Sequence, residues 1–346
     1  MTFSKISDIH FLYSLFFISS IFLSFASTPI FKSIAIKFQV LDFPIQKHKT
    51  HTEPLPYLGG FAIVTPFVFL FGVFFLAVGE LNLKILFAAV VPSSIMLFVG
   101  FFDDLRNVKP VTKLAYQAIC SLMAAWFLIE LGFAIEFANN LALGFVLSFS
   151  WIVGITNSMN LLDNHDGATV GVSAIQSAFV FLIAFRGEQH LVAVLAVVLC
   201  GACLGFMYWN FPPASIYLGD TGSLFIGIIT AILLIQLDPV STSAHVSLII
   251  PIFLGAIPIL DTLIAIVGRF SRNVSPLQGG KDHISHRLMA LGFSKKQTLA
   301  LILSISFSFC IMALTLSEVN RLAEAILFFG IIVFVALFFY LLKLDH

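Results

Sequence analysis

The sequence contains very little charge. Only 10% of its 346 residues are charged, 59% are hydrophobic, and the mean hydropathy is +1.04. Soluble domains carry about 25% charged residues, so this composition excludes a water-soluble surface. The formal net charge is zero, which excludes a bulk electrostatic field that would recruit nucleic acid or an acidic partner. Many apolar runs approach the roughly 20 residues that span a bilayer as a helix, which predicts a polytopic membrane protein.

The sequence also has few cysteines and no cleavable signal peptide. All four cysteines (Cys120, Cys200, Cys203 and Cys310) lie inside apolar runs. Cys200 and Cys203 have the spacing of a redox or metal pair, but no other ligand flanks them. We therefore expect buried small hydrophobic side chains at all four positions. The first apolar run lacks a basic start and a small-residue cleavage site, so it is interpreted as a membrane span.

The long apolar runs predict an all-α fold in one membrane domain that covers residues 1–346. They do not alternate with a period of two residues, which favours helices over a membrane β-barrel. We see no internal repeat, soluble domain or low-complexity tail. The expected spans number eleven, at residues 11–36, 61–79, 84–102, 114–132, 141–157, 168–185, 190–209, 222–237, 246–267, 297–316 and 322–342.

Basic residues between the spans predict the orientation. Thirteen of the 18 Lys and Arg residues fall in the connections on one face and four in those on the other, while Lys32 lies within the first span. The richer face is expected to be cytoplasmic. With eleven spans, the N-terminus lies outside and the C-terminus in the cytoplasm. All the polar motifs then emerge on the cytoplasmic face, whereas a transport path would distribute polar groups through the membrane.

Two of these motifs are rich in carboxylates and amides. Asp103 and Asp104 follow the third span directly, and adjacent carboxylates at a membrane boundary repel unless a cation or a proton intervenes. The second motif reads NSMNLLDNHDG, where Asn157, Asn160 and Asp163 follow at three-residue spacing and Asp166 comes three residues later. A continued helix would place the first three on one face. Capping of a helix end explains one such residue, but not four, so we interpret this stretch as part of a site.

The other cytoplasmic connections add an anion site and a cationic surface. Asp220 lies in GDTGS at an expected helix start, where backbone N–H groups favour anions, although helix capping is an alternative use. His283, His286 and Arg287 share a loop with Lys281, and Arg269 begins that loop. This set favours phosphate over zinc, because no further ligand set accompanies it. The first loop contributes His51, either to phosphate binding or to an anchor at lipid headgroups.

Taken as a set, these motifs resemble the polyprenyl-phosphate N-acetylhexosamine-1-phosphate transferase family. The resemblance rests on the paired aspartates after a span, NxxNxxDxxDG, GDxGS, the DHxxH loop and the early KTHTEPLPYLGG, all in the family's order over residues 42–300. The final loop is most similar to the undecaprenyl-phosphate N-acetylglucosamine-1-phosphate branch. One departure is Asn164, where the commoner family form has glycine, and another is Ala168, where it has leucine. Both aspartates of that stretch are retained.

The resemblance implies an enzyme that moves a sugar 1-phosphate from a UDP-N-acetylhexosamine to undecaprenyl phosphate and releases UMP. It implies Asp220, with Asp103, as ligands of Mg²⁺ or Mn²⁺. Asp103 and Asp104 would engage the lipid phosphate, one of them as the base. The remaining implied site residues are catalytic Asp163, Asp166, His283 and His286, and substrate-binding Asn157, Asn160, Lys113, Arg269, Arg287 and His51. The lipid tail is expected in an apolar groove between spans.

Alternatives stay open at this stage. A transporter or flippase of lipid-linked sugars would use charges at mid-span, and Asp261 is the one embedded acid that could serve it. We place Asp261 near the cytoplasmic end, in a structural or site-lining role. The sequence fixes neither the UDP-sugar nor the glycan pathway, such as lipopolysaccharide or cell-wall synthesis. It also leaves open a one-step or covalent two-step mechanism and the oligomeric state, for which a homodimer is one arrangement.

Overall fold

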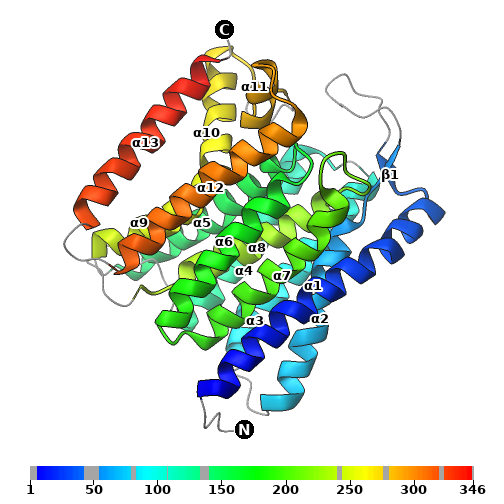
Figure 1. The fold of residues 1–346 in the computed structure, drawn as a ribbon, viewed down its shortest axis with the longest axis vertical. Helices are drawn as coiled ribbons and strands as arrows, with labels where there is room; N and C mark the ends of the chain where they lie inside the picture. Colours follow the sequence, from blue (N-terminus) through cyan, green and yellow to red (C-terminus); the bar gives the residue numbers. More distant parts are fainter. Residues whose placement is uncertain are drawn as a thin grey trace.

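The computed structural model describes residues 6–42, 54–78, 83–106, 108–132, 140–239, 244–275, 280–318 and 323–344. Helices dominate these residues (Figure 1). They are α1 (Ile6–Lys37), α2 (Gly59–Val78), α3 (Leu83–Arg106), α4 (Pro110–Glu130), α5 (Leu141–Leu162), α6 (Ala168–Arg186), α7 (His190–Asn210), α8 (Gly219–Gln236), α9 (Ala244–Leu254), α10 (Ala256–Ser271), α11 (Ile284–Ala290), α12 (Lys295–Glu318) and α13 (Ala323–Lys343). A short antiparallel pair, β1 (Leu41–Asp42) with β2 (Leu55–Pro56), precedes α2.

The apolar helices confirm an all-α membrane protein. Within the described ranges, eight helices are long and apolar enough to cross a bilayer, or nine if the bent pair α9–α10 counts as one span. Each of the eleven expected spans corresponds to a helix or to this pair, but the number of crossings stays a prediction. All four cysteines are buried and free, as expected for small hydrophobic side chains.

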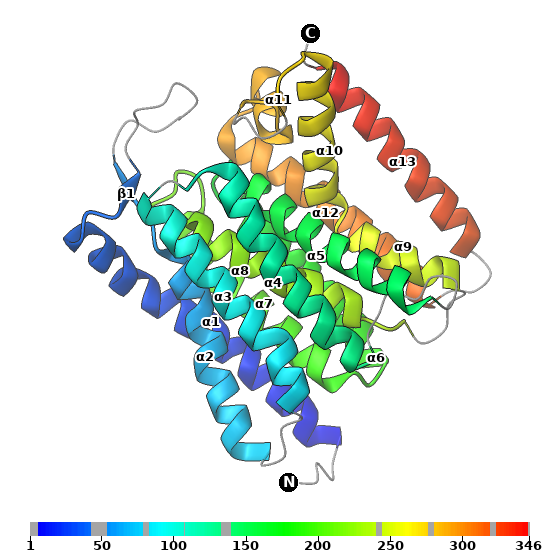
Figure 2. The same cartoon turned by 180° about the vertical axis from the view of Figure 1, so that it is seen from behind.

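The expected single span at 246–267 is two helices, α9 and α10, which meet at a bend of 75°. The cause lies in the backbone. Pro258 has no N–H to donate to the carbonyl of Leu254, so the helical hydrogen bond at this point cannot form. The side chain of Gln176 on α6 donates to that carbonyl instead, at 2.8 Å. Because of the bend, α10 runs in a different direction from α9 (Figure 2).

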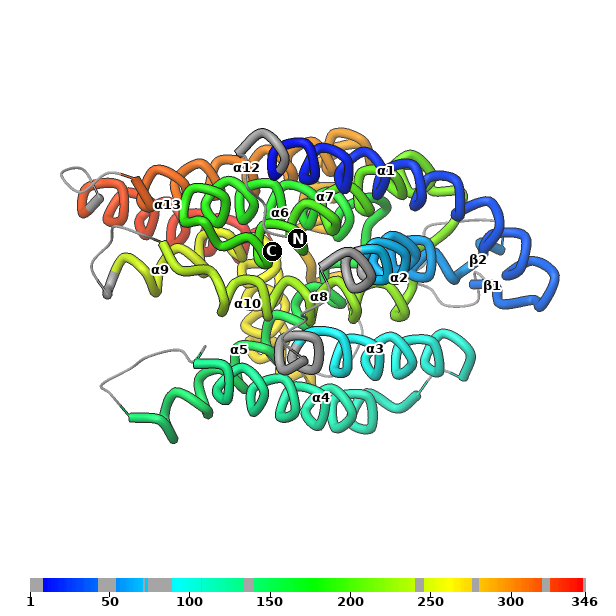
Figure 3. Tube along the Cα trace, turned by 90° about the horizontal axis from the view of Figure 1, so that it is seen from below, coloured from blue at the N-terminus to red at the C-terminus, as the bar shows by residue number. Residues whose placement is uncertain are grey.

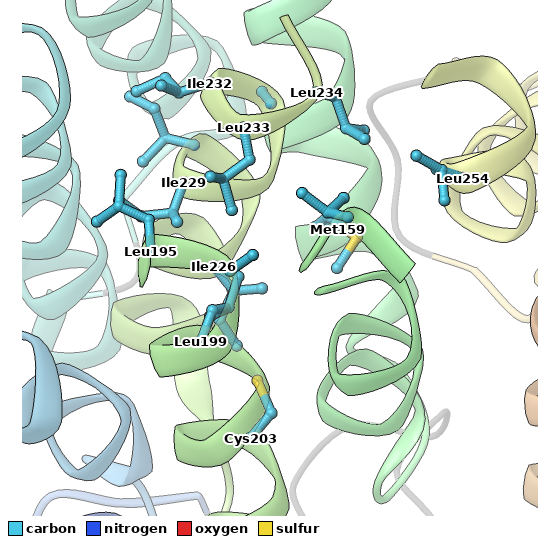
Figure 4. Packing of buried hydrophobic residues seen from close by; sticks show 14 of the residues in the cluster. Met159, Leu195, Leu199, Cys203, Ile226, Ile229, Ile232, Leu233, Leu234 and Leu254 are labelled. Atoms are coloured by element: carbon cyan, nitrogen blue, oxygen red, sulfur yellow. The ribbon is translucent and has the colours of Figure 1, made fainter. Parts of the chain in front are cut away.

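Helix α8 forms the centre of the bundle. Nearly all of its side chains are buried, and seen from below it lies between α3, α4 and α5 on one side and α1, α6, α7 and α12 on the other (Figure 3). A helix that is hydrophobic on every side is expected in such a position. Ile226, Ile229 and Leu233 of α8 pack among Leu195 and Leu199 of α7 (Figure 4).

Several close backbone approaches fix the start of α8. A Cβ atom added at Gly60 would lie 2.3 Å from the backbone nitrogen of Gly222, and one added at Gly100 would lie 2.3 Å from the carbonyl oxygen of Asp220. Helices α2 and α3 can approach α8 this closely only because both positions lack a side chain. The N-terminal end of α8 is thereby held against the last turns of α3.

The two ends of the bundle differ. The hairpin β1–β2, α11 and the C-terminal ends of α10 and α13 lie at one end, whereas α1 begins at the other (Figures 1 and 2). The start of α1 and the end of α13 therefore lie at opposite ends of the molecule. Eleven crossings would also place the termini on opposite sides of a membrane, and both their number and the orientation stay predictions.

Candidate active site

The carboxylate of Asp104 caps the first turn of α8. Its Oδ1 accepts a hydrogen bond from the backbone N–H of Asp220 at 2.8 Å, and its Oδ2 accepts from the backbone N–H of Thr221 at 3.0 Å and from the Thr221 hydroxyl. Gly219 begins the helix with a φ of +73°, and a Cβ there would lie 2.7 Å from Asp104 Oδ2. Asp104 thus satisfies the free donors of a helix start and joins α3 to α8.

Lys113 joins the neighbouring carboxylates. Its Nζ lies 2.9 Å from Asp103 Oδ2 and also forms an ion pair with Asp220 Oδ2. The other oxygen of Asp103 accepts from the backbone N–H of Val108 at 2.6 Å. Three helices, α3, α4 and α8, therefore each contribute one charged group to a single cluster. The partial burial of all three side chains strengthens these charge interactions relative to those in water.

Helix α5 contributes an amide to the same cluster. It continues to Leu162, five residues beyond the expected span, so Asn157 and Asn160 are both helical. Asn160 Nδ2 donates to Asp220 Oδ1 at 2.7 Å and to Ser223 Oγ at 2.8 Å. Asn157 takes no part in these bonds among the described residues. The structure thus brings the predicted residues Asp103, Asn160 and Asp220 together through Lys113, and it adds Ser223, to which the sequence assigned no role.

Asp163 and Asp166 occupy the turn between α5 and α6. Asp163 is the C-terminal cap of α5, and burial raises its pKa well above the usual range, an effect to which the carboxylates of Asp220 and Asp104 add. Asp166 Oδ2 accepts from the backbone N–H of Ala214 at 3.3 Å and lies 3.5 Å from Lys295 Nζ. Asp163 is therefore electrostatically part of the carboxylate cluster, whereas Asp166 is directed to the loop before α8 and to α12.

The basic loop is organised by Asp282. Its Oδ2 accepts from Arg269 Nε at 2.8 Å, and its Oδ1 pairs with Arg272. Burial alone would raise the pKa of Asp282, but the hydrogen bonds from the two guanidinium groups hold it below its ordinary value. Arg287 is buried and donates through Nε to the Asp282 carbonyl, and through Nη1 to the carbonyls of Leu341 and Leu342 near the end of α13, at 3.0 and 3.2 Å. These contacts tie the basic loop to the end of α13, and the role of Arg287 in substrate binding stays a prediction.

His283 is oriented by a buried acid. Its Nδ1 lies 2.7 Å from Oδ2 of Asp261, whose Oδ1 accepts from the backbone N–H of Ile284 at 2.7 Å. On the other side of the ring, Nη2 of Arg269 lies 3.4 Å from Nε2. Because a guanidinium only donates, Nε2 of His283 accepts the hydrogen bond from Arg269. Nδ1 therefore carries the ring hydrogen and donates a hydrogen bond to Asp261. Asp261, the acid embedded in an apolar run of the sequence, therefore contacts His283 and orients its ring.

Ser285 and Asn164 connect the basic loop, which also carries His286, to the turn between α5 and α6. Burial and the nearby His283 and Lys281 lower the pKa of His286 to about 4, so its ring is neutral near pH 7. The preceding Ser285 donates from its hydroxyl to Asn164 Oδ1, which ties the basic loop to the turn that carries Asp163. His51 lies outside the described residues. The sequence drew attention to the DH pair but assigned no role to Asp282, Ser285 or Asn164.

The carboxylate cluster fits a single hard cation shared with a substrate. Among the residues that the structure describes, no three His, Cys, Asp or Glu side chains are arranged to hold a metal by themselves. Asp103 and Asp220 nevertheless share one positive charge, the ammonium of Lys113. Mg²⁺ in phosphoryl-transfer sites commonly takes one or two carboxylates, with substrate phosphates and water completing its ligands. The donor set is therefore compatible with Mg²⁺.

Comparison with known proteins agrees with this geometry. Residues 86–238 match the family described as glycosyl transferase family 4. The chain is 34% identical over 328 residues to a probable undecaprenyl-phosphate N-acetylglucosaminyl 1-phosphate transferase of Bacillus subtilis (strain 168), covering 92% of this chain and 88% of that one. It is 31% identical over 298 residues to a decaprenyl-phosphate N-acetylglucosaminephosphotransferase of Mycolicibacterium smegmatis, covering 78% and 73%.

A more distant relative is the undecaprenyl-phosphate alpha-N-acetylglucosaminyl 1-phosphate transferase of Escherichia coli (strain K12), at 25% identity over 324 residues, or 90% of this chain and 83% of the relative. The family match begins before Asp103 and ends after Asp220, so it contains the whole carboxylate cluster. With its spanning helices and this cluster, the chain belongs to the polyprenyl-phosphate N-acetylglucosamine-1-phosphate transferases and is a multi-pass membrane phosphotransferase.

Proposed function

We propose that the protein transfers N-acetylglucosamine 1-phosphate from UDP-N-acetylglucosamine to undecaprenyl phosphate and releases UMP. In this reaction the sugar-bound phosphorus forms a bond to an oxygen of the lipid phosphate, and its bond to the oxygen that it shares with UMP breaks. The product is a polyprenyl diphosphate-linked sugar that starts a cell-envelope glycan. The site faces the cytoplasm, where nucleotide sugars are found, and the membrane is the bacterial inner membrane.

The observation that carries this proposal is the shared ammonium of Lys113 between Asp103 and Asp220. Phosphoryl transfer depends mainly on positioning and on neutralising phosphate charge. Asp220 and Asp103 would hold Mg²⁺ or Mn²⁺, which when bound neutralises charge on the donor diphosphate. Lys113 supplies a further positive charge to phosphate oxygens, and the amide of Asn160 fixes the direction of the Asp220 carboxylate.

In this proposal, the basic loop binds the UMP that leaves. Arg269 offers guanidinium donors, Asp261 holds the ring of His283 in one orientation, and the neutral imidazole of His286 lies on the same loop, which the bond from Ser285 to Asn164 ties to the turn of Asp163. Asp163 and Asp166 line the nucleotide-sugar side, while Asp103 contacts the lipid phosphate. N-acetylglucosamine is the sugar named in all three relatives above, which supports it as the donor sugar here.

The test uses the purified protein with undecaprenyl phosphate, Mg²⁺ and a panel of UDP-hexosamines, and it monitors UMP. We expect release that requires the lipid, the metal and UDP-N-acetylglucosamine. Asp220→Asn keeps the size of the side chain but removes its charge, so we expect turnover to fall to background while the protein stays folded in membranes. An active Asp220→Asn enzyme would refute the metal role of Asp220. No release with any donor from folded protein would refute the transferase reaction itself.

A further inference from the structure

His165 lies in the turn between α5 and α6, and its side chain is only 6% exposed. One ring nitrogen, Nδ1, lies 3.0 Å from the carbonyl oxygen of Asp166. A carbonyl only accepts hydrogen bonds, so Nδ1 carries the ring hydrogen and donates to this oxygen. In the neutral ring, the other nitrogen, Nε2, is therefore an acceptor that carries no hydrogen.

Nε2 of His165 is buried and has no hydrogen-bond partner among the residues that the structure describes. Burial lowers the pKa of the ring, and the ammonium of Lys295 lowers it further, so the ring is neutral near pH 7. Most buried polar atoms in proteins are hydrogen-bonded, because an unpaired one costs free energy. An apolar side chain would avoid that cost. A histidine at this position is therefore explained by a hydrogen-bond donor that comes from outside the chain.

The turn that carries His165 is held in one conformation by its own backbone. The N–H of Gly167 donates to Oδ1 of the buried Asn210 at 2.9 Å, and the N–H of Ala168 donates to the carbonyl of His165 at 3.0 Å. The ring is further fixed by its bond to the Asp166 carbonyl. The free acceptor is thus in place before a ligand arrives, which lowers the entropy cost of binding.

His165 lies on the side of the turn that faces the basic loop. Burial and the carboxylates of the cluster raise the pKa of Asp163, whereas the charges that act on His165 are those of Asp166 and Lys295. Burial lowers the pKa of His286, and His165 is among the nearby groups that lower it further. The ring of His165 is therefore close to the loop that binds UMP in the proposed function.

We propose that Nε2 of His165 accepts a hydrogen bond from the uridine part of the donor substrate, from N3–H of uracil or from a ribose hydroxyl, and so helps to set nucleotide specificity. The inference rests on the proposed function and adds a specificity-determining residue to its site. At neutral pH a phosphate diester and a lipid tail have no hydrogen to donate, so uridine is the part of a bound nucleotide that can pair with this acceptor. A buried acceptor disfavours ligands that lack the matching donor.

The binding test titrates UMP into the intact purified protein and measures Kd by calorimetry. His165→Leu is expected to weaken UMP binding about tenfold, the ratio that about 1.4 kcal/mol produces. His165→Gln keeps an acceptor oxygen near the place of Nε2 and should restore part of the affinity. The control is His10→Leu, which removes an exposed histidine near the start of α1, at the other end of the bundle, and should bind UMP as the wild type does.

Three analogues identify the donor group: N3-methyl-UMP, 2′-deoxy-UMP and 3′-deoxy-UMP. One of them is expected to bind the wild type about tenfold more weakly than UMP does, yet to bind His165→Leu as well as UMP does, because the partner of the missing hydrogen is gone. A loss of affinity that comes from the bulk of the methyl group would persist in His165→Leu. If every loss persists there, or no analogue binds more weakly than UMP, the proposal is overturned.

Thermal unfolding without nucleotide separates specificity from structure. We expect His165→Leu to melt at the same temperature as the wild type or higher, because an unpaired buried acceptor is removed, and UMP to stabilise it less than the wild type. A lower melting temperature with unchanged UMP affinity would show a structural role and overturn the proposal.

These measurements do not require turnover, so the two proposals can fail separately. An unchanged Kd for UMP in His165→Leu, or no UMP binding by the wild type, would overturn the role of His165 even if UMP release in the transferase assay is normal. UMP binding that depends on His165, in a protein that releases no UMP from any donor, would refute the transferase reaction and support the contact.

Discussion

Lys113 carries one charge for two carboxylates that come from different helices. Asp103 lies in the last turn of α3, which directly precedes α4, whereas Asp220 lies in the first turn of α8, 107 positions after Lys113. Without the ammonium, two partly buried negative charges would face one another, which disfavours ionisation of both. The ammonium offsets part of this repulsion and holds the two carboxylates close together, at the place that a divalent cation with its phosphate ligands would enter.

Asp261 is expected to act on catalysis through His283. In Asp261→Asn the amide oxygen still accepts from Ile284, but the amide nitrogen faces Nδ1 and donates to it. The ring then carries its hydrogen on Nε2, opposite the donor of Arg269. An active-site histidine in the wrong tautomer lowers kcat. We therefore expect kcat to fall by about tenfold or more, with a small change in thermal stability. A wild-type kcat would show that the tautomer of His283 is irrelevant.

Asp163 is expected to make stability depend on pH. Its pKa in the folded protein is raised by burial, while an unfolded aspartate titrates near pH 4. Above about pH 4 the unfolded chain therefore holds fewer protons than the folded one at this site, and rising pH favours unfolding until the raised pKa is passed. Below pH 4 the contribution disappears.

Asp163→Asn removes this titration. We therefore expect the melting temperature of the variant to exceed that of the wild type by an amount that grows as the pH rises above 4. In acid the two melting temperatures should become equal. Thermal unfolding in detergent at several pH values measures this difference. Asp166→Asn, a change in the same turn, is the control. A difference between Asp163→Asn and the wild type that is constant across pH would contradict the assignment.

The sequence alone predicts which site residues lie near one another only where they are close in the chain. Asn160 and Asp163 are three residues apart, and this spacing predicts that both lie at the same end of one helix, where the structure has Asn160 in the last turn of α5 and Asp163 as its cap. The sequence could not show that Asp104 would cap α8, because Asp220 lies 116 positions further along the chain and the intervening residues have no fixed path before the bundle assembles. For the same reason, the bonds from Arg287 to the carbonyls near the end of α13 could not be anticipated.

At the scale of elements, the position of the start of α8 depends on glycines in the neighbouring helices. A glycine at the contact lets the two backbones approach closely, because it has no side chain. Gly100 of α3 lies one turn before Asp103 and Asp104, against the carbonyl of Asp220. Gly100→Ala forces α3 away from α8, and overpacking of this kind costs about 1–3 kcal/mol. We expect a lower melting temperature together with a large loss of kcat, since both aspartates move with the helix.

Gly154→Ala is the matched control for that change. Gly154 lies in α5, and a Cβ atom added there would meet nothing within 4 Å. We expect this variant to keep its activity and to be slightly more stable, because alanine favours a helix interior by up to about 1 kcal/mol over glycine. If the two alanine variants behave alike, close packing of α3 on α8 is not what positions the carboxylates.

The expected helices are correct in kind but not in every boundary. Hydropathy placed the end of one span at residue 157, because the polar run after it resembles a loop; the helix continues to Leu162, and polar side chains at its end are satisfied by other elements of the site. Hydropathy also read α9 and α10 as one span. The bend depends on Pro258 and on a hydrogen bond from Gln176 of a distant helix, which no local pattern reveals.

At the scale of the whole molecule, the polar groups gather at one end of an apolar bundle. That end includes α11, the hairpin and the end of α13, and α1 starts at the opposite end (Figures 1 and 2). The excess of basic residues predicts this end to be cytoplasmic. Green fluorescent protein fused after His346 should then fluoresce, and alkaline phosphatase fused at the same point should be inactive. The reverse pattern would place the site on the wrong side for a cytoplasmic nucleotide sugar.

The bond between Asn164 and Ser285 has a consequence for how this family varies. Asn164 stands where the commoner family form has glycine, which cannot offer an oxygen to a serine two loops away. Chains with glycine at this place are under no pressure to keep a hydroxyl at the position of Ser285, whereas chains with asparagine are. We therefore expect residues at these two positions to vary together among related chains, because in this chain the bond joins the turn of Asp163 to the basic loop.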